Sequence, residues 1–299
     1  MTKGRGTLQT EQNFADYLSW HEATEAELRE IVRAEILREK YLEAHDLVIK
    51  AWTERQPFPF NGKYTQIRYV NIWPRPYQQP HPPIWVPGSG SLETWDFTID
   101  HDYVYCYLSY QGYKVGKLVL DGFWQEMERR EKEFNPYHAG FLQLVAVSEQ
   151  DNQVDEYKDD IEYFFRKCLH VPASYANAPG YRSERSVRSG LSQATASARR
   201  EQATEFTWKD FIDAGNVIAG SPATVREELR HAIKELRVGH LMLLLQFGDM
   251  PRERAMKNTH LFGTEVLPYI KDLWNEYDDR WWPKPLQEVQ QPAVPGKAS

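Results

Sequence analysis

Apolar runs alternate with helix-like segments along most of the chain, and this alternation limits the possible folds more than any other feature. The runs lie at 84–87, 103–108, 141–148 and 240–247. Segments with apolar residues at three- and four-residue steps separate or follow them, at 91–100, 117–134, 153–169, 221–236 and 251–274. Strands that read as continuous apolar runs and are joined by helices form a parallel sheet covered on both faces. The pattern therefore predicts an α/β fold.

The four strand–helix units leave the type of parallel sheet open. An open doubly wound sheet and a closed (β/α)8 barrel both fit the alternation, although four units are too few to close a barrel. Before them, the spacing predicts a helix over 22–52 and a hairpin or edge strand over 64–73, after the Asn61-Gly62 turn signal. The Pro-rich stretch 74–83 predicts an extended connector.

Two further segments lack a regular pattern. Residues 171–215 are rich in Ser, Arg and Ala, and a stretch of this length is typical of a lid-like insertion or of a solvated loop. In the lid interpretation Arg182, Arg185 and Arg188 clamp an anion. The Pro-rich tail 283–299 is expected to be disordered, so we expect one domain over 1–282.

A glycine- and hydroxyl-rich loop follows the first apolar run. Gly88 and Gly90 remove side chains where a strand passes into a helix, and Ser89, Ser91 and Thr94 add hydroxyl donors. Unpaired N–H groups at a helix N-terminus favour an anion, so the loop is a candidate phosphate cradle. The alternative is an ordinary connecting loop between a strand and a helix, without a ligand.

The charge and the apolar content exclude several classes of function. A net charge of −7 disfavours binding to nucleic acid or to an anionic membrane. The chain has no long transmembrane-type apolar run and no signal-peptide core near Met1, so we expect a cytoplasmic protein. Cys106 and Cys168 lack metal-ligand spacing and are expected to be buried and reduced, and we assign no metal.

Four segments resemble the bacterial luciferase-like flavin-dependent monooxygenases, the group that includes the alkanesulfonate and limonene types. They lie at 38–53, 61–94, 219–251 and 261–270. The resemblance implies a (β/α)8 TIM barrel, usually dimeric. It implies reduced FMN from a separate flavin reductase, or the deazaflavin F420 in some branches. It also implies O2 and a small organic substrate as reactants.

The resemblance also implies that roughly the first four βα units of such a barrel are missing from this sequence. The stretch Gly4–Thr7 is similar to the family's motif after the fourth strand, whose arginine contacts the flavin phosphate. Arg5 and the loop from Gly88 to Thr94 are therefore expected to meet around one phosphate, unless Arg5 is a terminal residue without a partner. The family's dimer helices belong to the missing half, which leaves a homodimer open.

Substrate contacts are assigned more weakly. Tyr105 and Tyr107 share one face of a strand and either point into the barrel or fill the core. Gln143 and Gln246 are candidates for polar contacts, and Gln143 is alternatively satisfied by backbone. Where some relatives carry Arg and His on the seventh strand, this chain has leucines, so no catalytic residue is assigned and an apolar substrate is favoured.

The sequence leaves three alternative hypotheses for the function. The first is an FMN-dependent monooxygenase acting on a small, apolar organic molecule. The second is an F420-dependent dehydrogenase on the same scaffold. The third is a non-catalytic remnant or binding protein that has no flavin turnover.

Overall fold

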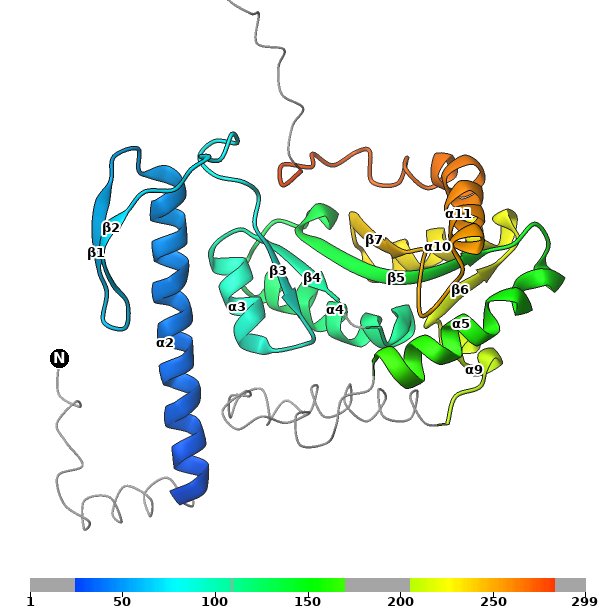
Figure 1. Ribbon diagram of the computed structural model, residues 1–299, viewed down its shortest axis with the longest axis horizontal. Helices are drawn as coiled ribbons and strands as arrows, with labels where there is room; N and C mark the ends of the chain where they lie inside the picture. Colours follow the sequence, from blue (N-terminus) through cyan, green and yellow to red (C-terminus); the bar gives the residue numbers. More distant parts are fainter. Residues whose placement is uncertain (1–24, 109, 170–204, 283–299) are drawn as a thin grey trace, which may run out of the picture.

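The core of the chain is a parallel five-stranded sheet, as the alternation predicts (Figure 1). The computed structural model describes residues 25–108, 110–169 and 205–282. The strands of the sheet are β3 (Trp85–Gly88), β4 (Val104–Tyr107), β5 (Ala139–Val147), β6 (Val217–Gly220) and β7 (His240–Leu244). Every ladder between them is parallel, which confirms the expected sheet type.

The long strand β5 organises the sheet because it has partners along both of its edges. Gly140 pairs with Cys106 of β4 and with His240 of β7. Leu144 pairs with β6 and again with β7. Strands β4 and β6 therefore follow one another along one edge of β5, and β7 lies along the other. Within the described ranges β3 and β7 each pair on one edge only, so these strands form an open sheet.

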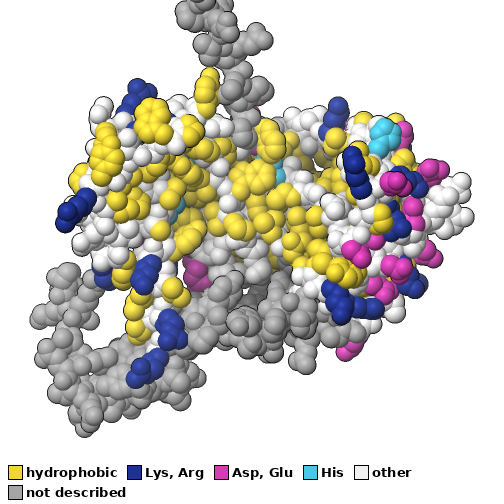
Figure 2. Space-filling model, viewed as in Figure 1, with side chains coloured by type: hydrophobic (Ala, Val, Ile, Leu, Met, Phe, Trp, Pro, Cys, Tyr) yellow, Lys and Arg dark blue, Asp and Glu magenta, His cyan; other side chains and the backbone are white. Residues whose placement is uncertain are grey.

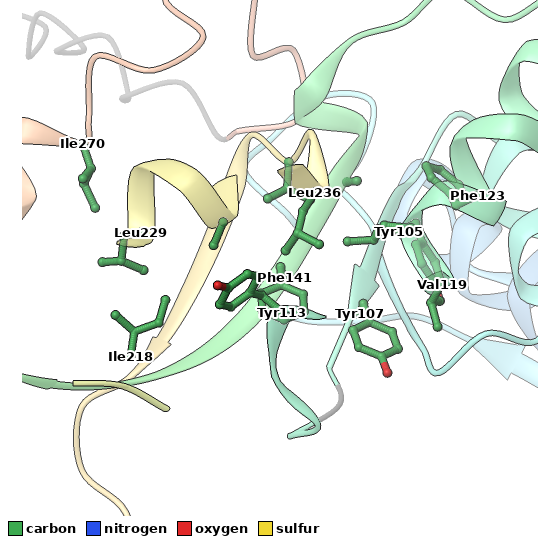
Figure 3. Close-up of a cluster of buried hydrophobic side chains, with 14 of the residues drawn as sticks. Tyr105, Tyr107, Tyr113, Val119, Phe123, Phe141, Ile218, Leu229, Leu236 and Ile270 are labelled. Carbon is green, nitrogen blue, oxygen red and sulfur yellow. The ribbon is translucent and has the colours of Figure 1, made fainter. Parts of the chain in front are cut away.

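Helices cover one face of the sheet and enclose the largest apolar core (Figure 3). The helices are α3 (Leu92–Asp100), α4 (Gly112–Arg129) and α10 (Pro222–Leu236). Ser221 caps α10, because its hydroxyl accepts the N–H of Thr224, as the Ser-Pro signal predicts. Tyr105 of β4 stacks on Phe123 of α4 with 4.9 Å between ring centroids.

The second face of the sheet is apolar and only partly covered. Figure 2 shows hydrophobic side chains gathered over the middle of the sheet. Met242 and Leu244 of β7 are half-buried and pack with the clusters on this face. The carboxyl half of this face packs against two helical turns and two short α-helices. These elements are η2 (Asp151–Tyr157), α5 (Lys158–Tyr163), η3 (Phe164–Cys168) and α9 (Trp208–Asp213).

The N-terminal part of the described chain forms a helix and a hairpin beside the sheet. They are α2 (Glu25–Thr53), which confirms the expected helix, and the antiparallel strands β1 (Phe58–Asn61) and β2 (Gln66–Val70). The Glu43 carboxylate accepts the backbone N–H groups of Tyr64 and Thr65, at up to 3.1 Å, and so holds the hairpin turn against α2. His45 Nε2 lies 2.8 Å from the Tyr103 hydroxyl and ties α2 to the start of β4.

The segment after the last long helix returns across the amino ends of the strands. The remaining helical elements are η1 (Pro136–His138), α11 (Arg252–Leu261), η4 (Phe262–Val266) and η5 (Leu267–Tyr269). Beyond them, Trp281 Nε1 donates to the Asp102 carbonyl at 2.7 Å. The Trp281 ring stacks on His138 with centroids 4.6 Å apart. This contact buries the imidazole of His138.

Acid should therefore destabilise the protein through His138. Burial lowers the pKa of His138 to about 4, although Asp102, at 3.6 Å from Nε2, raises it and Arg280 and Lys132 lower it further. The unfolded chain binds a proton near pH 6.5, whereas the folded chain does so only near pH 4. Between these values stability falls as the pH falls, by on the order of 2–3 kcal/mol.

Urea unfolding followed by tryptophan fluorescence at pH 7 and pH 5 measures this loss. A His138→Phe variant keeps the ring contact with Trp281 and removes the proton, so its stability should change less between the two pH values. His240 contributes in the same direction, because burial also lowers its pKa. If the free energy of unfolding of the variant falls between pH 7 and pH 5 by as much as that of the unmodified chain, the assignment to His138 is contradicted.

The structure corrects three details of the sequence reading. Strand β6 was not expected, because its four residues stand between Gly215 and Ser221 and are too short to show a period. Helix α4 begins five residues before the predicted start and ends five residues before the predicted end. Cys168, expected to be buried, is exposed at the end of η3, while Cys106 is buried as expected.

Candidate functional site

The loop that joins β3 to α3 is the strongest candidate site in the described chain. It runs from Gly88, the last residue of β3, to Ser91, the residue before α3. It therefore lies at the carboxyl end of a parallel strand, where ligands bind in folds of this class. Gly90 has φ 101°, a conformation that residues with a side chain rarely adopt.

The N-terminus of α3 offers backbone N–H groups at this loop. Ser91 precedes the helix, but its side chain makes no capping hydrogen bond. The Ser91 hydroxyl instead donates to Glu93 Oε2 at 2.9 Å. The first-turn N–H groups of a helix lack acceptors within the helix, and the helix dipole favours negative charge there. The loop can therefore receive an anion, although the carboxylate of Glu93 opposes one.

The structure brings the described members of the expected phosphate cradle together. A Cβ placed on Gly88 would lie 3.1 Å from Thr94 Cγ2, so the loop folds back onto the first turn of α3. Ser89 is exposed and Gly90 is buried beneath it. Arg5, the expected guanidinium partner, lies outside the described residues, and so does the 171–204 part of the insertion, with the candidates Arg182, Arg185 and Arg188.

Tyr105 and Tyr107 face away from the second face of the sheet. Both belong to the core between the sheet and the helices, and the intervening Cys106 packs on the opposite side with Trp281. Of the two alternatives for these tyrosines, a position inside a barrel and core filling, their packing matches core filling. The physical reason is that α3 and α4 supply the aromatic partners Trp95 and Phe123 on that side.

The two glutamines have different surroundings. Gln143 is buried on β5, and its Nε2 donates to the carbonyls of Leu144, Gly215 and Asn216 at 3.0 to 3.2 Å. The amide nitrogen of Gln143 therefore bonds to backbone carbonyls, which was the alternative to a ligand contact. Gln246 is exposed just beyond β7, at the same end of the sheet as the loop, with β4 and β5 between β7 and β3.

At this end of the sheet, sequence reasoning named Tyr105 for a different role, a substrate contact, and missed Asn258 altogether. Tyr105 lies directly behind the loop, and its oxygen accepts the N–H of Gly90 at 3.2 Å. Asn258 on α11 is fully buried and bonds to the carboxyl ends of β5 and β7. No sequence signal marks a helical asparagine for such a role. For Tyr105 there was a signal, because the two-residue spacing of the tyrosines places both on the same one of the two faces of the sheet.

The described residues contain no group of three or more His, Cys, Asp or Glu side chains arranged to hold a metal ion. Nor does any helix among them combine the length and the apolar character that crossing a membrane requires.

The fold and the loop together define an α/β protein of the kind that binds ligands at the carboxyl ends of parallel strands. The chain belongs to the luciferase-like monooxygenase family, because residues 21–240 match the model of that family. This membership confirms the resemblance to that family, and the match includes the segments 38–53 and 61–94 and the first part of 219–251. No curated protein matches the sequence.

Solved structures share the fold at low sequence identity. The monooxygenase RslO1 from Streptomyces bottropensis is 15% identical, with a TM-score of 0.52, over 85% of this chain and 65% of its own. The oxygenating constituent of 3,6-diketocamphane monooxygenase from Pseudomonas putida, solved with FMN, is 18% identical, with a TM-score of 0.54, over 76% of this chain and 62% of its own. The chain thus spans less than two thirds of the length of these relatives.

The loop suits the phosphate of a flavin nucleotide on its own geometry. The helix N-terminus is not capped by Ser91, the buried Gly90 presents backbone rather than a side chain, and the hydroxyl of Thr94 belongs to the same turn. The ion–dipole attraction and the donors fit a dianion, and the carboxylate of Glu93 is the one group in the loop that opposes it. The residues present fit the group.

Proposed function

We propose that the protein is a flavin-dependent monooxygenase that uses reduced FMN and O2 to oxygenate a small, apolar organic substrate. Family membership supports the reaction class, and the uncapped N-terminus of α3 behind a bare glycine loop is the observation that supports the cofactor. Residues 88–94 hold the phosphate, and Arg5 completes the cradle. A separate reductase supplies the reduced cofactor.

The apolar second face of the sheet supplies the rest of the site in this proposal. When bound, reduced FMN supplies the reaction with O2, and the protein's task is to orient the reactants and exclude water. Met242 and Leu244 present apolar side chains on that face, beyond the loop along the sheet. They favour an apolar substrate over a charged one, because an unpaired charge is costly beside such a surface.

The proposal includes a closed barrel in the active enzyme. Strands β3, β4, β5 and β7 make up half of such a barrel, with β6 outside the ring beside β5, and β3 and β7 each have one unpaired edge among the described residues. Four more βα units joined to those edges complete a (β/α)8 barrel. The difference in length between this chain and its solved relatives supports those units. A homodimer remains part of the proposal, with its interface in those units.

Placing a carboxylate in the loop should weaken FMN binding at least tenfold. Ser89 is exposed at the mouth of the loop, so Ser89→Asp adds a negative charge where the phosphate binds. Fluorescence titration of the purified chain with FMN and with riboflavin, which lacks the phosphate, measures the effect. The affinity for riboflavin should stay within about twofold.

Asn152→Asp is the matched control, because it adds the same charge at an exposed position of η2. Its FMN affinity should equal that of the unmodified chain. A parallel titration with F420 identifies the dehydrogenase alternative, and O2 consumption with reduced FMN identifies the oxygenase. A chain that binds neither cofactor overturns the proposal and leaves the non-catalytic remnant.

A further inference from the structure

Tyr105 forms the floor beneath the glycine loop. Its side chain is fully buried, and its oxygen accepts the backbone N–H of Gly90 at 3.2 Å. A Cβ placed on Gly88 would lie 2.7 Å from Tyr105 Cε2 and 3.2 Å from the hydroxyl oxygen, so ring and loop are in direct contact. The loop therefore rests on this one side chain at two of its residues.

The neighbours of Tyr105 fix the place of its hydroxyl. Phe123 stacks on the ring, with centroids 4.9 Å apart and planes 23° apart. Trp95 of α3 meets the ring edge-on at 6.3 Å and 89°. A ring packed between α3 and α4 in this way has little freedom to move, so the oxygen marks a fixed point to which Gly90 is bound.

The direction of the Gly90 amide decides which donors remain for a ligand. Because this N–H points inward to Tyr105, it is not available to an anion on the outer side of the loop. The left-handed backbone of Gly90 accompanies this inward turn. The donors for an anion are then the Ser89 hydroxyl and the amides at the very start of α3, because the Ser91 hydroxyl donates to Glu93 and the Thr94 amide to the Ser91 carbonyl.

We propose that Tyr105 is a positioning residue of the phosphate loop, whose hydroxyl fixes Gly90 so that the N-terminus of α3 stays open to the phosphate. The inference rests on the proposed function, and it adds a residue on the neighbouring strand that does not touch the ligand. Tyr105 acts through Gly90, and its loss should be felt as a looser loop rather than as a missing contact.

A phenol suits this position better than other hydrogen-bond acceptors. A carboxylate would accept the same N–H but would place a second negative charge behind the phosphate. Burial raises the pKa of Tyr105, so the hydroxyl remains neutral in any ordinary buffer. A neutral oxygen therefore holds Gly90 without repelling the anion.

Hydrogen exchange in the ligand-free protein tests the positioning role without any cofactor. In Tyr105→Phe the ring packing is kept and only the acceptor is lost, so amides in residues 88–92 should exchange about three- to tenfold faster, the range expected for one net hydrogen bond. Tyr157→Phe is the matched control. Tyr157 is also fully buried, and its hydroxyl donates at 2.9 Å to the carbonyl of Val147 on β5, a strand that does not pair with β3.

Ligand titration tests whether the loop so fixed is the phosphate loop. Tyr105→Phe should weaken FMN about three- to tenfold and leave riboflavin unchanged, while Tyr157→Phe should change neither. Equal weakening of FMN and riboflavin, or equal exchange in the two variants, overturns the inference. If the unmodified chain binds no flavin, the proposed function fails, and the exchange measurement still decides whether Tyr105 fixes Gly90.

Discussion

Replacing Gly112 with alanine should lower the free energy of unfolding by on the order of 3–5 kcal/mol. Gly112 begins α4 with φ +80°, and an added Cβ would lie 2.5 Å from the backbone of Gly215 and Asn216. Backbone cannot yield as a flexible side chain does. Any movement of Gly215 would also break its hydrogen bond from Gln143. Urea unfolding at pH 7 measures the loss.

Gly263→Ala is the matched control for this substitution. Gly263 lies in η4, and an added Cβ there would meet no atom within 4 Å. Its stability should stay the same or rise by up to about 1 kcal/mol, because alanine loses less backbone entropy than glycine in a helical turn. Equal unfolding midpoints for the two alanine variants would show that the tight approach at Gly112 is not a constraint.

Asn258→Ala should cost a similar amount for a different reason. The Asn258 amide donates to the Val145 and Leu245 carbonyls, and its oxygen accepts the Val147 N–H, each at 2.8 Å. The substitution leaves buried backbone groups without partners, which should lower the free energy of unfolding by on the order of 3–5 kcal/mol. The same urea titration measures it.

The neighbouring Thr259→Ala is the control on α11. Thr259 is exposed, and its hydroxyl bonds only to the Ala255 carbonyl of its own helix. Its loss should cost less than about 0.5 kcal/mol. If Asn258→Ala proves as mild as Thr259→Ala, then α11 does not hold the ends of β5 and β7 together through this side chain.

The sheet was predictable because its strands are continuous apolar runs, and such runs have few other uses in a chain of this size. Four of the five parallel strands were expected near their observed positions. The fifth, β6, has four residues and is placed by its pairing with Leu144 to Val147 of β5, a contact 73 residues away in the chain. No local pattern contains that information.

The direction of side chains was the least predictable property. A period of two says that Tyr105 and Tyr107 share a face, but a strand buried on both faces does not say which face it is. Cys168 follows two buried phenylalanines, yet η3 is a π-helical turn, and the extra residue per turn moves the cysteine off their face. Both outcomes depend on packing that the sequence does not display.

The sequence indicated which residues form the candidate loop, but it did not indicate which side chains hold the loop in place. Glycines and hydroxyls at the end of a strand indicated an anion site, and the structure gathers Gly88 and Thr94 around one turn. The hydrogen bond from Gly90 to the Tyr105 hydroxyl depends on a neighbouring strand in space. The hydrogen bond from Ser91 to Glu93 depends on the rotamers of these side chains. Neither follows from spacing alone.

The return of the chain to its first sheet strand has a mechanical consequence. The ring of Trp282 lies 6.0 Å from that of Trp85 on β3 and 6.0 Å from that of His240 on β7, so the last described residue contacts both strands. A pulling force applied at this end would load β3 and β7 together. We therefore expect the described α/β unit to unfold in a single step under force, because α11 cannot separate from the sheet while the ring contacts of Trp282 hold.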